Sequence, residues 1–267
     1  MIQSQMTSDL DYNLFKRKVK ESFGLDLEAY KRQQMERRLR AVMERRGASD
    51  FRTYFSLIQK DTDLLNEFLD RMTINVSELF RNPEHFEVLE KRVLPDLLAK
   101  NKNLKLWSAG CSFGGEAYSL AILLDELAPT GKHSILATDI DEKMLARALE
   151  GVYYASEIRN VSKVRLSKYF QQTQDGWKVI DKLRRMIRFC RHDLLKDNFE
   201  TGFHLIACRN VVIYFTDKAK SELYERFYRS LTPGGYLFVG GTERIHAHAQ
   251  IGYENPYHFF YRKPEVF

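Results

Sequence analysis

A glycine-rich turn in this sequence stands where it could hold a small ligand against the end of a strand. The turn, Gly110-Cys-Ser-Phe-Gly-Gly115, follows an apolar run over residues 104–109 and precedes an amphipathic stretch that starts near Glu116. Glycine lets a backbone approach a ligand closely, and open α/β sheets bind ligands where a strand end meets a helix N-terminus. The order strand, turn and helix therefore predicts a ligand site, although a tight turn with no ligand has the same pattern.

A carboxylate at the end of the next apolar run indicates the kind of ligand. Asp139 ends the run 135–139, and an acid at the tip of the second strand of such a unit usually accepts hydrogen bonds from ribose hydroxyls. The turn lacks the Gly-x-x-x-x-Gly-Lys-Ser/Thr pattern, and Ser112 occupies the second glycine position of Gly-x-Gly-x-x-Gly. We therefore predict nucleoside binding without a preference for pyrophosphate.

From residue 104 onward, strand patterns alternate with helical patterns, which is typical of a mostly parallel doubly wound α/β sheet. The last strand follows its predecessor closely enough to pair with it antiparallel. The expected elements are strand 104–109, helix 116–127, strand 134–138, helix 141–150, strand 203–208, helix 216–231, a turn over 231–235, and strands 236–240 and 257–261.

The alternation stops between residues 161 and 192. Residues 168–180 predict a hairpin on an Asp175-Gly176 turn, and 186–190 predict a strand in either the hairpin unit or the main sheet. We expect a small antiparallel insertion over 163–190 within a domain of residues 79–267.

Residues 1–78 have helical periodicity without strand signals, and we expect an all-helical domain and linker there. Gly24 and Gly47 end the first two of four predicted helices, and Asn82-Pro83 starts a later helix with Asn82 as its cap. The helix over 30–46 has seven basic residues largely outside its apolar stripe. Such a bundle rarely carries chemistry, so it is expected to dock or to cover a site.

Composition excludes several classes. No apolar run approaches the ~20 residues of a membrane helix, and the N-terminus lacks a signal-peptide pattern. The cysteines Cys111, Cys190 and Cys208 are far apart, which indicates reduced thiols in a cytoplasmic protein. His246 and His248 have no metal-ligand spacing, so no metal is expected. A net charge of +6 permits an acidic partner, or is simply an ordinary basic surface.

Five segments of the chain carry a family resemblance: 73–81 with His85-Phe86, 106–112, 137–141, 208–215 and 231–235. Together they resemble the bacterial chemotaxis receptor methyltransferases usually called CheR. The first and fourth segments, Thr-Ile-Asn-Val-Ser-Glu-Leu-Phe-Arg and Cys-Arg-Asn-Val-Val-Ile-Tyr-Phe, are specific to that family, and the last is common to many methyltransferases. The resemblance implies a helical N-terminal domain, a class I methyltransferase domain and an inserted β-subdomain.

The resemblance also implies an activity and a site. The activity is methyl transfer from S-adenosyl-L-methionine to glutamate carboxylates of chemotaxis receptors, which leaves S-adenosyl-L-homocysteine. Glu116 would hold the methionine amino group, Asp139 the ribose, and Asp193-Leu194 the adenine. The implied cofactor residues are Asn75, Ser77, Arg81, Gly110, Glu116, Asp139, Asp193, Leu194, Arg209 and Asn210. Alternative roles are a surface ion pair for Arg81, a helix cap for Asp193 and a strand-end turn for Asn210.

One segment departs from the family, which commonly has Gly-Glu-Glu-Pro-Tyr-Ser where this chain has Gly114-Gly-Glu-Ala-Tyr-Ser119. Glu116 is kept, whereas Gly115 removes a carboxylate and adds flexibility, and Ala117 replaces a proline. These changes support the alternative of a non-catalytic protein that binds S-adenosylmethionine or a receptor.

A glutamate with a pKa near ~4.3 is ionised at neutral pH, so its methylation requires alignment and removal of water rather than a strong base. Tyr214 is predicted to orient the attacking carboxylate, with core packing as its alternative. Arg92 could position the same carboxylate by a fork of hydrogen bonds.

The basic helix suits the acidic cytoplasmic helical bundle of a receptor. Arg37, Arg38 and Arg40 are expected to dock there by complementary charge, and a solvated face is the alternative. A nucleic-acid methyltransferase is the less favoured function, because Arg209-Asn-Val-Val stands where such enzymes typically carry Asn/Asp-Pro-Pro-Tyr/Phe, and the chain has no aromatic-interleaved basic stretch. We therefore expect a cytoplasmic monomer that binds neither nucleic acid nor the membrane interior.

Overall fold

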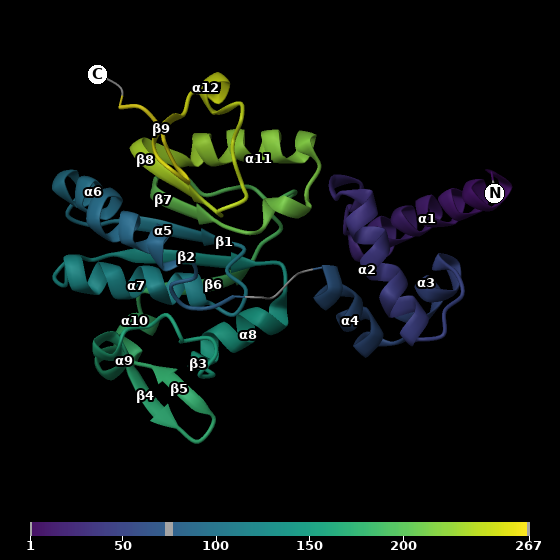
Figure 1. Ribbon diagram of the computed structural model, residues 1–267, viewed down its shortest axis with the longest axis horizontal. Helices are drawn as coiled ribbons and strands as arrows, with labels where there is room; N and C mark the ends of the chain where they lie inside the picture. Colours follow the sequence, from purple (N-terminus) through teal and green to yellow (C-terminus); the bar gives the residue numbers. More distant parts are fainter. Residues whose placement is uncertain (1, 73–76, 266–267) are drawn as a thin grey trace. The chain divides into compact units, whose positions relative to one another are not determined.

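The computed structural model describes residues 2–72 and 77–265, and the chain divides into two compact units (Figure 1). The helical unit comprises Met1–Ile74 and Tyr214–Lys220, and the sheet unit comprises Asn75–Ile213 and Ser221–Phe267. The segment Tyr214–Lys220, expected in the sheet domain, groups with the helical unit. Its backbone explains this grouping, because Tyr214 accepts a hydrogen bond from the Lys31 amide and Thr216 donates one to the Ala29 carbonyl.

Within the described residues, the helical unit contains the four helices that the periodicity predicts. They are α1 (Ile2–Phe23), α2 (Arg32–Arg45), α3 (Phe51–Lys60) and α4 (Thr62–Met72), with a 3-10 helix η1 (Leu27–Ala29) before α2. Their core is aromatic: the Phe15 ring lies 5.2 Å from that of Phe51 and 6.0 Å from that of Phe68, between centroids. Asp50 caps α3 by accepting a hydrogen bond from the Thr53 amide at 2.7 Å.

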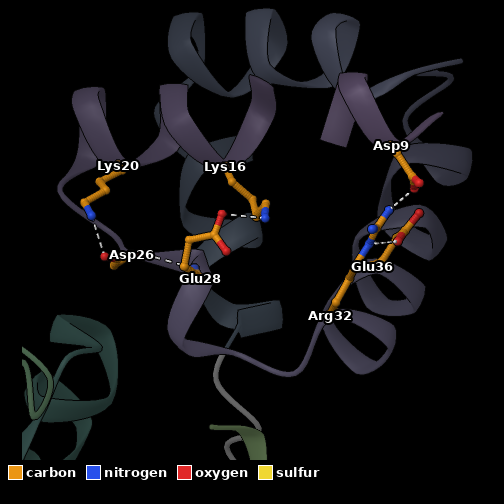
Figure 2. A network of polar contacts seen from close by, with 7 residues as sticks. All are labelled: Asp9, Lys16, Lys20, Asp26, Glu28, Arg32 and Glu36. Atoms are coloured by element: carbon orange, nitrogen blue, oxygen red, sulfur yellow. Dashed lines mark hydrogen bonds and ion pairs between the residues drawn. The ribbon is translucent and has the colours of Figure 1, made fainter. Parts of the chain in front are cut away.

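Ion pairs connect α1 to the segment that follows it and to α2 (Figure 2). The pairs are Lys16–Glu28, Lys20–Asp26 and Arg32 with both Asp9 and Glu36. Most of these side chains are partly exposed, and exposed pairs contribute only about 0–1 kcal/mol each. The aromatic core therefore supplies more of the stability of this unit than its charges do.

The described part of the sheet unit contains a seven-stranded sheet of order β6-β2-β1-β7-β8-β10-β9. The strands are β1 (Lys105–Ala109), β2 (Ser134–Asp139), β6 (Ile187–Arg191), β7 (Phe203–Cys208), β8 (Leu231–Val239), β9 (Glu254–Tyr257) and β10 (Phe260–Arg262). β10 pairs antiparallel with both β8 and β9, and the other described pairs of this sheet are parallel. The predicted doubly wound sheet with an antiparallel last strand is confirmed.

Helices cover both faces of this sheet, as the adjacent residues Trp107 and Ser108 of β1 show. Neighbouring strand residues point to opposite faces. Ser108 reaches Glu116 on α7 (Gly115–Leu127), whereas the Trp107 ring lies 5.4 Å from that of Phe227 on α11 (Asp217–Ser230). The other helices are α5 (Pro83–Val88), the π-helical η2 (Leu89–Val93), α6 (Leu94–Lys100), α8 (Glu142–Glu150), η3 (Val212–Tyr214) and α12 (His248–Ile251).

The predicted antiparallel insertion exists, with different limits. A three-stranded sheet of order β3-β5-β4 combines β3 (Val152–Tyr153), β4 (Phe170–Thr173) and β5 (Gly176–Val179), with helices α9 (Lys163–Tyr169) and α10 (Asp181–Arg184). The antiparallel sheet therefore takes its first strand from before residue 163. Residues 187–191 form β6 in the main sheet, which decides between the two positions left open for that strand.

Three local predictions are wrong. The hairpin turns at Gln174-Asp175, because Gly176 already pairs with Thr173; a Cβ on Gly176 would stand 2.5 Å from the Tyr153 carbonyl oxygen, so close approach to β3 requires this glycine. Residues 231–235 form the first part of β8 instead of a separate turn, and the register of its pairing with β7 shifts there. Residues 254–262 form two strands, because the chain reverses at Phe259, whose φ is 67°.

Candidate functional site

Five parallel strands end at one edge of the main sheet. Because β6, β2, β1, β7 and β8 are parallel, their carboxyl ends share that edge. β2 and β6 lie on one side of β1, and β7 and β8 lie on the other, so the order in which strands are added to the sheet reverses beside β1. Open α/β sheets bind ligands at such a switch point. The predicted residues from Gly110 to Asn210 lie at or after the ends of these strands.

The loop after β1 folds back over the end of β2. The amides of Gly110 and Cys111 both donate to the Thr138 carbonyl, at 2.8 and 2.9 Å. Gly110 has a φ of 81°, and a Cβ there would stand 2.4 Å from the Val211 side chain, so only glycine fits. The loop backbone therefore approaches the strand ends as closely as the sequence predicts.

Asp139 is buried and held by two backbone amides. Its Oδ2 accepts a hydrogen bond from the Ser112 amide at 2.7 Å and its Oδ1 one from the Asp141 amide at 3.0 Å. An ionised carboxylate has about four acceptor positions, so each oxygen keeps capacity for a hydroxyl of a ligand. Burial raises the pKa of Asp139, and these backbone hydrogen bonds oppose that rise.

Glu116 lies in the first turn of α7, and its side chain is 12% exposed. Ser108 donates to its Oε1 at 2.7 Å, and Nη1 of Arg209 lies 3.6 Å from its Oε2. Burial raises the pKa of Glu116, and the positive charge of Arg209 opposes this most strongly. The site therefore offers a buried anion that a ligand ammonium could approach.

Arg209 supports this anion from inside the protein. Its side chain is only 2% exposed, and its Nη2 donates to the Arg81 carbonyl at 2.9 Å and to Asn82 Oδ1 at 3.1 Å. Asn82 is the N-cap residue of α5, as predicted, but its side chain makes no capping hydrogen bond and accepts one from Arg209 instead. Arg209 therefore joins the start of α5 to Glu116.

Ser77 lies beside Gly115 at the start of α7. A Cβ on Gly115 would stand 3.3 Å from Ser77 Oγ and 3.1 Å from the Glu78 carbonyl carbon. Gly115 has no positive φ and belongs to the helix, so its role is to leave space rather than to add the flexibility expected for it. Asn75 lies outside the described residues.

Asp193 and Leu194 follow β6, whose Arg191 pairs with Asp139. Asp193 Oδ1 accepts a hydrogen bond from the Leu195 amide at 2.9 Å, so this carboxylate organises a short turn. Leu194 is buried, and its carbonyl accepts a hydrogen bond from Arg226 at 2.6 Å. Both residues thus lie near the strand end that carries Asp139.

The two predicted substrate residues lie in different units. Tyr214 belongs to the helical unit, where the Arg38 guanidinium lies 4.4 Å from the centroid of its ring. Arg92 is exposed on η2 and borders a surface pocket with Val88 and residues 255–258. Ten residues of helix, about 15 Å along its axis, separate Arg92 from Asn82 beside Arg209. The structure therefore does not bring Arg92 to the strand ends.

The sequence prediction missed Glu243, a buried carboxylate after β8. It accepts backbone hydrogen bonds from Asn210, Val212 and Gly240. The signal available in the sequence is an acid two residues beyond the Gly240-Gly241 pair that follows the strand. Among the residues that the structure describes, no cluster of three metal-ligating side chains occurs, and no helix is long and apolar enough to cross a membrane.

A mostly parallel seven-stranded sheet, with one antiparallel strand and two buried carboxylates at its strand ends, is the arrangement of a class I methyltransferase dependent on S-adenosyl-L-methionine. The carboxylates fit the two polar ends of that cofactor, because Glu116 complements an ammonium group and Asp139 a ribose.

Known proteins identify the family within this class. Residues 10–73 match the all-alpha domain of CheR methyltransferase, and residues 75–256 match its SAM-binding domain. A chemotaxis protein methyltransferase of Listeria monocytogenes is 43% identical over 95% of this chain and 97% of its own. Those of Borreliella burgdorferi and Pseudomonas aeruginosa are 34% and 35% identical, each over 89% of this chain and over 89% and 91% of their own. The chain belongs to the CheR methyltransferase family.

The close packing around Gly115 leads to a prediction. We expect Gly115→Ala to weaken binding of S-adenosyl-L-homocysteine about threefold, because overpacking at this position must shift segment 77–78 away from the start of α7. The new methyl group would meet the backbone of Glu78 and displace Ser77. Titration calorimetry measures the affinity, and a thermal melt confirms that the variant is folded. Unchanged affinity would show that segment 77–78 does not support the cofactor.

Proposed function

We propose that this chain transfers the methyl group of S-adenosyl-L-methionine to glutamate side chains of chemotaxis receptors, which forms methyl esters for sensory adaptation. The placement of the buried Asp139 and the largely buried Glu116 at the sheet edge carries the proposal, because these carboxylates complement the ribose and the ammonium of that cofactor. Similarity over nearly the whole chain to proteins named chemotaxis protein methyltransferase supports the choice of receptor.

The proposed cofactor roles follow from these positions. Glu116 holds the methionine amino group, Asp139 the ribose hydroxyls, and Asp193 and Leu194 the adenine. Arg209 acts through Glu116, which it keeps ionised and in place. The remaining proposed cofactor residues are Asn75, Ser77, Arg81, Gly110 and Asn210.

S-adenosyl-L-methionine supplies an electrophilic methyl group on a sulfonium. The attacking glutamate is already ionised at neutral pH, so the chain contributes alignment and removal of water. Tyr214 is the residue that we propose to orient the carboxylate, through its phenolic hydroxyl. Arg92 is not included, because it borders a surface pocket far along its helix.

We also propose that the helical unit docks on the cytoplasmic helical bundle of the receptor, with the chain acting as a cytoplasmic monomer. Arg37 is the main candidate, because it is exposed on α2. Arg38 stacks on Tyr214, and Arg40 pairs with Glu36 at 2.7 Å. These contacts leave Arg38 and Arg40 less available to a partner.

Methyl-labelled S-adenosyl-L-methionine and chemoreceptor-bearing membranes test the function. We expect label on the receptor that mild base releases as methanol, which is characteristic of a carboxyl methyl ester. A control enzyme first shows that the receptors can be methylated. The same receptors must remain unlabelled when this protein is left out. No receptor label with normal cofactor binding would indicate the non-catalytic alternative, and nuclease-sensitive label on added RNA would indicate a nucleic-acid methyltransferase.

A further inference from the structure

The carboxylate of Glu243 joins the ends of two neighbouring strands. Its Oε2 accepts hydrogen bonds from the amides of Gly240 and Asn210, both at 2.7 Å, and its Oε1 accepts one from the Val212 amide at 3.0 Å. Gly240 directly follows β8, and Asn210 and Val212 belong to the segment after β7. One side chain therefore satisfies three backbone donors that no strand ladder could pair.

This carboxylate holds Asn210 in an unusual backbone conformation. Asn210 has a φ of 61°, which is uncommon for a residue with a side chain and is maintained only by its surroundings. The Asn210 side chain also lies close to Gly240, because a Cβ on Gly240 would stand 3.1 Å from its Nδ2 and 2.6 Å from Glu243 Oε2, so only glycine leaves both groups their space. Glu243 and Gly240 together thus determine where the amide of Asn210 lies.

The charges around Glu243 suit a permanently placed anion. Glu243 is only 4% exposed, and burial raises the pKa of its carboxyl group. The three backbone donors and the positive charge of Arg209 act in the opposite direction and favour the ionised form. A carboxylate that receives this many donors is costly to replace, because each abandoned amide stays buried without a partner.

We infer that Glu243 is a positioning residue for methyl transfer, which acts on the cofactor through Asn210. The inference rests on the proposed role of Asn210 at the cofactor site, and it requires no contact between Glu243 and any ligand. It predicts that changes at Glu243 alter cofactor affinity in protein that is still folded. A residue that only stabilises the fold would change the melting temperature and leave that affinity unchanged.

Glu243→Gln is the main test, because glutamine keeps the shape but presents an NH₂ group to at least one of the three donors. We expect the Kd for S-adenosyl-L-homocysteine, measured by titration calorimetry well below the melting temperature, to rise about tenfold, or about 1.4 kcal/mol. The KM for S-adenosyl-L-methionine should rise in parallel, with a smaller change in kcat. Glu254→Gln, which changes an exposed residue of β9, is the matched control and should leave the Kd as in the unchanged chain.

A folded Glu243→Gln variant with an unchanged Kd would overturn the inference. If that variant does not fold, Gly240→Ala decides, because its methyl group would displace the Glu243 carboxylate from the Asn210 amide without removing the charge: a raised Kd supports the inference and an unchanged Kd overturns it. The calorimetric measurement needs no receptor. Failure of receptor methylation in the unchanged chain would therefore count against the proposed function and not against this role of Glu243.

Discussion

Replacing Arg209 with methionine is expected to destabilise the sheet unit by about 3–5 kcal/mol, because it leaves the buried Glu116 carboxylate without its cation. The same change removes the hydrogen bonds to the Arg81 carbonyl and to Asn82. Cofactor binding should weaken as well, because burial already raises the pKa of Glu116 and removing the opposing charge of Arg209 raises that pKa further, which disfavours the ionised form that attracts an ammonium group.

Urea unfolding followed by tryptophan fluorescence measures this loss in the sheet unit alone. Both tryptophans of the chain, Trp107 and Trp177, belong to that unit. Arg229→Met is the matched control, because Arg229 forms an exposed pair with Glu225 and such pairs contribute only about 0–1 kcal/mol. The double variant Arg209→Met with Glu116→Gln should regain part of the lost stability. Unfolding of Arg209→Met at the same urea concentration as the unchanged chain would contradict the buried-pair account.

Asp139→Asn is expected to weaken binding of S-adenosyl-L-homocysteine about 100-fold, because two hydrogen bonds to a charged acceptor, each worth roughly 1.5 kcal/mol, are lost or weakened. The amide also turns an NH₂ group toward the Ser112 or the Asp141 amide, which now donate to the carboxylate. Titration calorimetry measures the change. Glu142→Gln, at an exposed carboxylate nearby, should bind normally. Equal affinity of Asp139→Asn and the unchanged chain would exclude Asp139 as the ribose acceptor.

The same carboxylate predicts a pH dependence of binding. Burial raises the pKa of Asp139 in the free protein, so it takes up a proton at a higher pH than an ordinary aspartate does. The ribose hydroxyls favour the ionised form, and binding is therefore coupled to loss of that proton. Affinity should fall by about tenfold per pH unit below the raised pKa, and the component due to Asp139 should vanish in Asp139→Asn. Parallel pH profiles for the two proteins would contradict this coupling.

Local sequence patterns determined the strand, turn and helix order, the glycine loop and the strand-end acid Asp139, whereas Glu116 was predicted from the family resemblance. These features can be predicted from the sequence because apolar runs, positive φ and helix starts each depend on a few neighbouring residues. Gly110 is an example, since the turn that requires its positive φ lies within residues 110–115. The four helices of the N-terminal unit are readable for the same reason.

The tertiary structure alone decided which groups those residues face. Arg209 is turned inward to Glu116 and the start of α5, and Glu243 accepts a hydrogen bond from the Asn210 amide, 33 residues earlier in the chain. The position of β6 in the main sheet, and the need for Gly176 beside β3, likewise depend on partners distant in sequence. Buried polar groups must be paired wherever the fold brings them, and that pairing follows from the packing of whole elements rather than from local propensity.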